Sequence, residues 1–178
     1  MLGITSLAIG LGLCVVAYLL LGIINGRDFY ALIEWKVIVL LACLIPVAAA
    51  LEETGGSQLI ANLIVTQTEN LPAWGVLAVL MVITMTLSDF LNNVATALIA
   101  APIGVSVANS IGASPDPFLM GVAVAASCAF LTPIGHKNNT IIMGPGNYRF
   151  GDYWRMGLML EVLVIVVGVP MIAWVWPF

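Results

Sequence analysis

Two short stretches decide the fold class of this chain: SDFLNNVAT at residues 88–96 and PIGHKNNT at residues 133–140. Each is a cluster of Asn, Gly, Pro or ionisable residues near the middle of a long apolar run. Backbone outside a helix is tolerated in a bilayer only where it lines a polar cavity or is buried in protein. Paired interruptions of this kind point to the solute site of a secondary transporter. The two breaks therefore favour membrane transport.

The composition around these breaks is that of a membrane protein. Of the 178 residues, 62% are hydrophobic and 8% are charged, and the mean hydropathy is +1.12. A soluble domain carries about a quarter charged residues, and a helix crosses a bilayer with roughly 20 apolar residues. Charged residues are absent from residues 1–25, 71–88, 90–115, 117–135 and 162–178. We therefore predict an all-α polytopic protein of the cell membrane, with one transmembrane domain over residues 1–178.

Each break lies within one structural segment of this predicted domain. Residues 73–110 predict a hairpin of two half-helices, each roughly 15 residues long and so marginal for a full crossing, around a non-helical tip at 91–94. Residues 117–147 predict one transmembrane helix that is interrupted at 133–139.

Charge distribution addresses whether residues 73–110 form a re-entrant hairpin or two full spans. A re-entrant hairpin places every basic residue except Lys137 on the cytoplasmic side, as the positive-inside rule requires. Two full spans would instead separate Arg149 and Arg155 from Arg27 and Lys36. We therefore expect a re-entrant hairpin.

The hairpin tip carries groups that suit both a cation and an anion. Ser88, Asn92 and Asn93 offer side-chain oxygens, and an unwound turn adds free carbonyl groups, which together suit a hard cation such as sodium. The free N–H groups at the start of the second half-helix attract anions through the helix dipole. The alternative is an Asn-rich kink whose polar groups are satisfied by neighbouring helices.

The second break contains ionisable side chains at membrane depth. Pro133 and Gly135 stop the helix, and Asn138 or Asn139 can cap the half-helix that follows. An ionisable group in this position is by default a functional hypothesis. The alternatives are that Lys137 reaches an interface and that the sole histidine, His136, is a neutral hydrogen-bonded helix terminus.

Two acidic residues lie in the neighbouring apolar sequence. Asp89 precedes the tip and is interpreted as a sodium ligand, a proton carrier or a cap. Glu161 is interpreted as an acid near the N-terminus of the last helix, expected at 156–176, where the helix dipole favours a negative charge.

Both breaks resemble motifs of the divalent anion:sodium symporters, a family that carries dicarboxylates, citrate or sulfate. SDFLNNVATA at 88–97, followed by API at 101–103, is similar to the second Ser-Asn-Thr hairpin motif of that family. AFLTPIGHKNN at 129–139, followed by GPG at 144–146, resembles its second Pro-x-x-Thr-x-Pro-Asn segment. The resemblance covers nearly the whole chain and corresponds to the C-terminal half of such a transporter. It implies an inverted-repeat fold, an N-terminal half as partner, a homodimer and an elevator-like movement.

The resemblance also implies which residues form the site. By position, Asn92, Asn93 and Val94 take the places of Ser-Asn-Thr, while Gly135, His136 and Asn139 fall in the sodium-binding loop. The implied sodium ligands are Ser88, Asn92, Thr132, Gly135 and Asn139. The implied substrate-binding residues are Asn92, Asn93, Val94, Lys137 and Asn139, and the implied coupling ion is sodium.

Two departures from the family pattern bear on the substrate. Val94 replaces a hydroxyl that in the family helps to hold a substrate carboxylate, so sulfate or another compact oxyanion competes with citrate or succinate. Lys137 suggests that a fixed ammonium group stands in for one coupling sodium ion. This hypothesis implies fewer coupled sodium ions than in the rest of the family.

Other functions remain open at this point. A proton-coupled antiporter would use Asp89 or Glu161 as its proton carrier. A non-transporting membrane scaffold has no need of two unwound helices, so the breaks disfavour it. We do not expect an enzyme, because any catalytic constellation would need His136, which has no cysteine or second histidine nearby in the sequence. The expected partners are a small anion and the lipid bilayer, with no nucleic acid.

Overall fold

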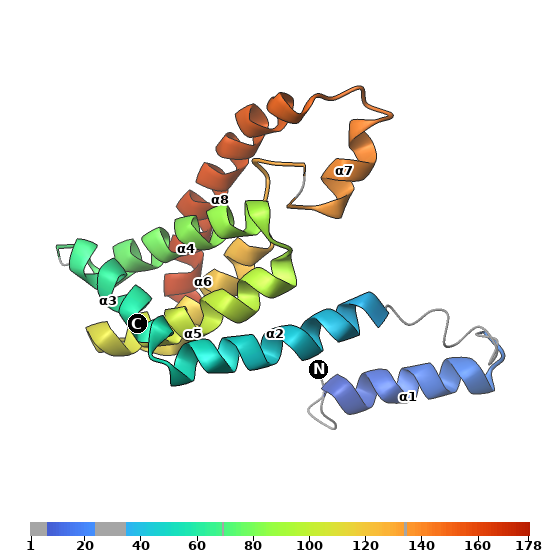
Figure 1. Cartoon of the computed structure of the whole chain (residues 1–178), viewed down its shortest axis with the longest axis horizontal. Coiled ribbons are helices and arrows are strands. Elements are labelled where there is room, and N and C mark those ends of the chain that lie inside the picture. Colours follow the sequence, from blue (N-terminus) through green and yellow to red (C-terminus); the bar gives the residue numbers. More distant parts are fainter. Residues whose placement is uncertain (1–6, 24–34, 69, 134) are drawn as a thin grey trace. The chain divides into compact units, whose positions relative to one another are not determined.

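A computed structural model describes residues 7–23, 35–68, 70–133 and 135–178 (Figure 1). Throughout these ranges the regular structure is helical and strands are absent, as predicted. The chain divides into two compact units, Met1–Leu40 and Leu41–Phe178, and the second contains the predicted site. In order, the helices are α1 (Leu7–Leu20), α2 (Trp35–Glu53), α3 (Gly56–Gln67), α4 (Ala73–Phe90), α5 (Asn93–Ile111), α6 (Pro115–Ala126), α7 (Lys137–Met143), the short 3-10 helix η2 (Phe150–Asp152) and α8 (Tyr153–Val175).

Several of these helices are long and apolar enough to cross a membrane. In the described part of the chain they are α4, α5 and the stretch Phe150–Val175, and the α2–α3 pair, bent by 65°, would add a fourth if it is one span. The protein is therefore a polytopic helical membrane protein.

The two helices of the hairpin are longer than the sequence indicated. α4 has 18 residues and α5 has 19, so the expectation of half-helices of roughly 15 residues was wrong. α4 ends at Phe90, just before the predicted tip at 91–94, but α5 begins inside this tip at Asn93 and continues to Ile111. Helix length therefore no longer distinguishes a re-entrant hairpin from two full spans. The charge argument remains a prediction, since Arg27 and the side chain of Lys36 lie outside the described residues.

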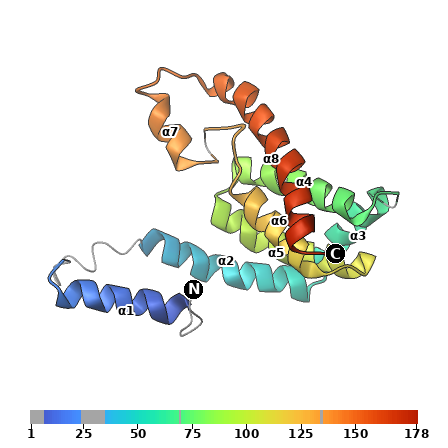
Figure 2. The same cartoon turned by 180° about the vertical axis from the view of Figure 1, so that it is seen from behind.

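The core of the second unit lies where α4, α5 and α6 meet. Leu77 and Met81 of α4 are fully buried with Phe118 of α6 and Val107 of α5. α3 packs against α5, and α8 packs against α4 and α6 (Figures 1 and 2). This packing fixes the end of α4 beside the end of α6, which is where the two sequence breaks meet.

The outer surfaces of these helices are apolar as well. Leu163, Val166 and Trp174 of α8 are all more than half exposed, as are Leu59 and Leu63 of α3. Helices that are apolar on their outer faces as well as in their core suit lipid or further protein rather than water. The exposed side chains therefore agree with a membrane location.

The second break, within the predicted helix at 117–147, begins earlier than predicted. α6 ends at Ala126 and α7 begins at Lys137, so the described non-helical residues of the break are 127–133, 135 and 136, rather than the predicted 133–139. The N–H groups of Ser127 and Cys128 bond to the carbonyl groups of Val124 and Ala125, both at 3.0 Å, which tightens and ends the last turn. The chain then continues without regular structure beside the hairpin tip.

Candidate functional site at the hairpin tip

Only residues 91 and 92 are non-helical at the tip of the hairpin. Asn92 is the N-cap of α5: its Oδ1 accepts a hydrogen bond from the N–H of Ala95 at 2.8 Å. Its carbonyl group accepts the N–H of Thr96 at 3.0 Å. The sequence predicted Asn92 as a binding residue, and the structure gives its amide oxygen the role of a helix cap, with the rest of the side chain exposed.

The cap leads to a stability prediction. Asn92→Ala is expected to lower the free energy of unfolding by about 1 kcal/mol, because it removes the acceptor of an otherwise unpaired helix N–H. Asn92→Asp keeps this acceptor and should retain wild-type stability. Denaturant unfolding of the purified variants measures both values, and equal stability of the Ala variant and the wild type would contradict the capping role.

A chain of side-chain contacts connects the tip to α6 and to the second break. Ser88 Oγ donates to the carbonyl group of Ala126 at 2.6 Å and lies 3.4 Å from Oδ1 of Asn93. Nδ2 of Asn93 in turn lies 3.4 Å from Nδ1 of His136. Residues from both breaks therefore meet in one polar cluster, as the sequence predicted.

Thr132 and Asp89 form a second connection between the two breaks. Thr132 Oγ1 donates to the carbonyl group of Asp89 at 2.7 Å and accepts the N–H of Gly135 at 3.2 Å. Asp89 Oδ1 accepts the N–H groups of Leu131 at 3.0 Å and Thr132 at 3.3 Å. The end of α4 is thus hydrogen-bonded directly to the non-helical segment.

Gly135 is needed where this segment passes the hairpin. A Cβ atom at this position would lie 2.9 Å from the carbonyl oxygen of Ser88 and 3.1 Å from Cα of Asp89. It would also lie 2.6 Å from Cβ of Ala129. The absence of a side chain therefore allows the break to approach the backbone of the tip.

α7 is connected to the same segment through its first turn. His136, and not Asn138 or Asn139, occupies the N-cap position, and its side chain makes no capping hydrogen bond. Asn139 lies inside the helix, where its Nδ2 donates to the carbonyl group of Thr132 at 3.4 Å. Thr140 Oγ1 donates to the carbonyl group of Pro133 at 2.6 Å. The predicted Asn cap is therefore wrong, and Asn139 instead ties the helix back to the break.

Glu161 belongs to this region and not to a helix terminus. It lies well inside α8, is only 7% exposed, and its Oε1 accepts the N–H of Phe130 at 3.4 Å. The interpretation as an N-terminal acid was wrong, because α8 begins at Tyr153 and Glu161 faces the break. The signal that could have placed it is its position as the sole ionisable residue in an apolar run.

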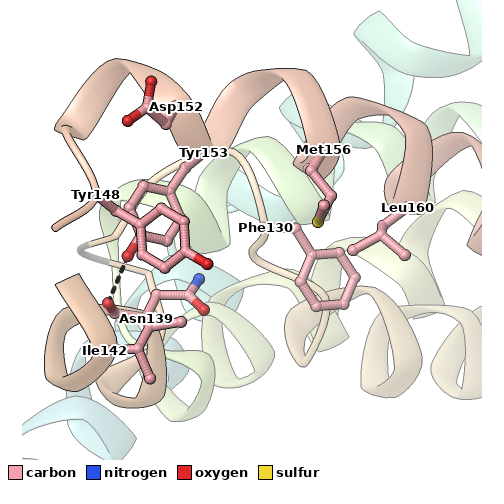
Figure 3. A pocket seen from close by; sticks show the side chains of 9 residues that line it. Phe130, Asn139, Ile142, Tyr148, Asp152, Tyr153, Met156 and Leu160 are labelled. Atoms are coloured by element: carbon pink, nitrogen blue, oxygen red, sulfur yellow. Dashed lines mark hydrogen bonds between the residues drawn. The ribbon is translucent and has the colours of Figure 1, made fainter. Parts of the chain in front are cut away.

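A cavity of about 210 Å³ lies behind α7. Figure 3 shows the rings of Tyr148 and Tyr153 beside Asn139 on one side, with Phe130 and Met156 on the other. The hydroxyl group of Tyr153 donates to the carbonyl group of Asn139 at 2.8 Å. The lining of the cavity is mostly apolar, and the described residues that form it include Asp152 but no Lys or Arg. The polar cluster at the tip is therefore a better candidate for anion binding than this cavity.

The structure brings together most, but not all, of the predicted site residues. Ser88 and Asn93 belong to the chain of contacts that reaches His136, whereas Thr132, Gly135 and Asn139 belong to the second connection, through Asp89. Val94 is 39% exposed beside the tip, and Asn92 is a cap. Lys137 begins α7, but its side chain lies outside the described part of the structure. The binding roles of these residues remain predictions.

Comparison with known proteins places the chain in a family. The model of the citrate transporter family, CitMHS, matches residues 1–178. The chain belongs to this citrate transporter family. The resemblance to sodium-coupled transporters of divalent anions is thereby confirmed, and a multi-pass membrane protein of a transporter family follows.

The relatives of this chain include proteins of bacteria, an alga and an animal. The uncharacterized transporter YfbS of Escherichia coli (strain K12) is 37% identical over 167 residues, which are 92% of this chain and 27% of the relative. The sodium-dependent high-affinity dicarboxylate transporter 3 of Caenorhabditis elegans is 33% identical, over 75% of this chain and 24% of the relative. The sodium/sulfate cotransporter 2 of Chlamydomonas reinhardtii is 29% identical, over 84% of this chain and 17% of the relative. The chain thus spans about a quarter or less of these proteins.

Proposed function

We propose that this chain forms part of a sodium-coupled symporter of small anions, with its binding site at the tip of the α4–α5 hairpin. The observation that carries the proposal is the single polar cluster in which Ser88 and Asn93 of the hairpin meet His136 of the break. Two relatives named as sodium-coupled carriers of a dicarboxylate and of sulfate support this substrate class.

The start of α5 supplies the features that an anion needs. The N–H groups of Asn93 and Val94 lie in the first turn, where no intrahelical acceptor is available. The dipole of a helix places partial positive charge at this end. The Asn93 amide group adds a side-chain donor beside it, and the His136 ring lies next to this amide. We assign anion binding to Asn93 and Val94, with Asn92, Asn139 and Lys137 as further contacts.

Sodium, the co-transported ion in this proposal, fits the oxygen-rich side of the cluster. Carbonyl, hydroxyl and amide oxygens are ligands that hard cations prefer. Asn139 donates through Nδ2, which leaves its Oδ1 free to accept. Ser88 and Thr132 add hydroxyl oxygens and Gly135 adds a carbonyl group. The Asn92 amide oxygen accepts the Ala95 N–H with one lone pair, which leaves its second lone pair for the ion. These five residues are the proposed sodium ligands.

The wider architecture that we propose follows the family resemblance. The chain would supply the C-terminal half of an inverted repeat in the cell membrane, with residues 73–110 as a re-entrant hairpin and 117–147 as the broken helix. An N-terminal half would complete the site, and a homodimer would carry an elevator-like movement. Transport without any enzymatic reaction is the activity that this arrangement supports.

Uptake measurements test the proposed function. We expect the intact transporter that contains this chain to take up radiolabelled sulfate, succinate or citrate more rapidly with sodium than without it. Asn93→Ala should reduce this uptake about tenfold, since a hydrogen bond to a charged ligand contributes about 1.5–3 kcal/mol. Asn109→Ala is the matched control, because Asn109 is exposed at the other end of α5.

The outcomes of this experiment separate the alternatives. Uptake driven by a proton gradient and independent of sodium would favour proton coupling. No uptake of any of the three anions, by a transporter that is folded and present in the membrane, would contradict the proposal. An equal loss of uptake in the Asn93→Ala and Asn109→Ala variants would indicate that the binding site does not lie at the tip.

A further inference from the structure

The cavity beside α7 takes the place of a packing partner for this helix. Unlike α3 to α6 and α8, α7 packs against no other helix in the described part of the chain (Figures 1 and 2). The space of about 210 Å³ has Asn139 and Ile142 of α7 on one side and Tyr153, Met156 and Leu160 of α8 on the other. A hydrogen bond crosses it, from the Tyr153 hydroxyl group to the Asn139 carbonyl group at 2.8 Å. The space between the two helices is therefore open to an occupant.

This cavity is polar at one end and apolar at the other. Tyr148, Asp152 and Tyr153 lie together at the end near η2, whereas Met156 and Leu160 lie farther along α8 (Figure 3). The rise from Tyr153 to Leu160 along the helix is about 10 Å. Met156 and Leu160 are also exposed on the outside of α8. The apolar end of the cavity therefore reaches an outer surface that suits lipid rather than water.

Basic and aromatic side chains lie around the polar end. Arg149 and Arg155 flank η2 in the sequence, and both are exposed. The guanidinium carbon of Arg155 lies 5.8 Å from the centroid of the Trp154 ring, which is half exposed. Asp152 uses its carboxylate to accept the backbone N–H of Arg149 at 2.8 Å. Arginine beside exposed tryptophan is typical of a membrane–water interface, and a guanidinium group binds phosphate through several donors.

These two ends together select an amphipathic anion as the occupant. A small transported anion does not suit the apolar end, and an apolar helix from elsewhere in the transporter would make no use of the arginines. An anionic phospholipid has a phosphate group for the one and an acyl chain for the other. A dry cavity of about 150 Å³ accommodates benzene, so a space of about 210 Å³ has room for a segment of one acyl chain. Basic pockets between transmembrane helices are known to bind anionic head groups.

We propose that the cavity between α7 and α8 binds one anionic phospholipid, with its phosphate group at Arg149 and Arg155 and one acyl chain between Ile142 and Leu160. The bound chain fills the space beside α7 and holds this helix against α8. Because α7 is hydrogen-bonded to the second break through Asn139, the lipid also stabilises the non-helical segment. The inference does not rest on sodium-coupled transport.

Photolabelling of the purified intact transporter tests the proposal. The probe is a phosphatidylglycerol that carries a diazirine in one acyl chain, added to the protein in micelles of a neutral detergent. We expect label on the peptides of α7 and of the first half of α8. Unlabelled phosphatidylglycerol should compete for this labelling, whereas phosphatidylcholine with the same chains and glycerol phosphate without chains should not. Phosphatidylglycerol should also raise the melting temperature more than either.

Variants at the two ends of the cavity test its two parts separately. Arg149→Gln and Arg155→Gln should each weaken phosphatidylglycerol binding about fivefold, the contribution of one arginine at an anionic lipid surface. Arg149→Lys retains the charge and should lose less. Leu160→Trp fills the apolar end and should abolish labelling of the cavity peptides. Leu163→Trp is the matched control, because Leu163 is exposed on the same helix and does not line the cavity.

Four other outcomes would overturn the proposal. Absence of label from these peptides in the wild type would indicate that another part of the transporter or a second copy covers the cavity, whether or not the variants fold. Equal competition by phosphatidylcholine would reduce the contact to nonspecific lipid. Competition by glycerol phosphate would assign the arginines to a soluble phosphate. An equal loss of label in Leu160→Trp and Leu163→Trp would place the lipid on the outside of α8 rather than in the cavity.

Discussion

Replacing Gly157 by Ala is expected to abolish transport and to lower the free energy of unfolding by about 3 kcal/mol, the upper end of the usual range for overpacking. A Cβ at this position of α8 would collide with the carbonyl group of Phe130 and lie 2.9 Å from the backbone N of Leu131. These are backbone atoms, which cannot move aside as a flexible side chain does. The N–H groups of the same two residues, Phe130 and Leu131, donate hydrogen bonds to Glu161 and Asp89. The new methyl group would therefore push the break away from both acids.

Gly168 provides the matched control in the same helix. A Cβ at Gly168 would meet its nearest neighbour, the terminal methyl of Met81, at 3.7 Å, which is an ordinary contact. Alanine is favoured over glycine inside a helix by up to about 1 kcal/mol, so Gly168→Ala should be neutral or stabilising. Denaturant unfolding and anion uptake should be measured for both variants. A Gly157→Ala protein with wild-type stability and uptake would show that α8 and the break are not in close contact.

The helical character and the two breaks could be predicted from sequence because both depend on local features. Long uncharged runs require helices in lipid, and Asn, Gly and Pro clusters mark where those helices stop. The true start of the second break could not be predicted in this way. Residues 127–131 look like continuing apolar helix, but the N–H groups of Phe130 and Leu131 bond instead to Glu161 and Asp89, which are distant in the sequence.

Residue type alone could not separate caps from binding residues at the tip. An Asn beside a helix start is typical of both, and the structure makes Asn92 a cap while Asn93 faces His136. The same ambiguity misplaced Glu161, since an acid early in a helix and an acid facing a buried break have the same local sequence. Only the packing of α8 against α4 and α6 distinguishes the two.

Thr132→Val is expected to lower the free energy of unfolding by about 2 kcal/mol and to reduce uptake strongly, because one hydroxyl group connects both breaks. Valine has nearly the same shape, so the change removes only the donor to the Asp89 carbonyl group and the acceptor of the Gly135 N–H. A buried polar group left without its partner costs about 1–3 kcal/mol. Thr132→Ser retains the hydroxyl and should stay within about 1 kcal/mol of the wild type.

Sodium distinguishes this connecting role from the role of Thr132 as a proposed sodium ligand. If the hydroxyl holds the hairpin to the break, Thr132→Val must be less stable than Thr132→Ser even in sodium-free buffer. If the hydroxyl acts only as a ligand, the two variants will have the same melting temperature without sodium and differ only when sodium is added. Thr132 Oγ1 donates to the Asp89 carbonyl group at 2.7 Å, a contact within the protein that needs no ligand. We therefore expect the difference in sodium-free buffer, with added sodium increasing it further if Thr132 also binds the ion.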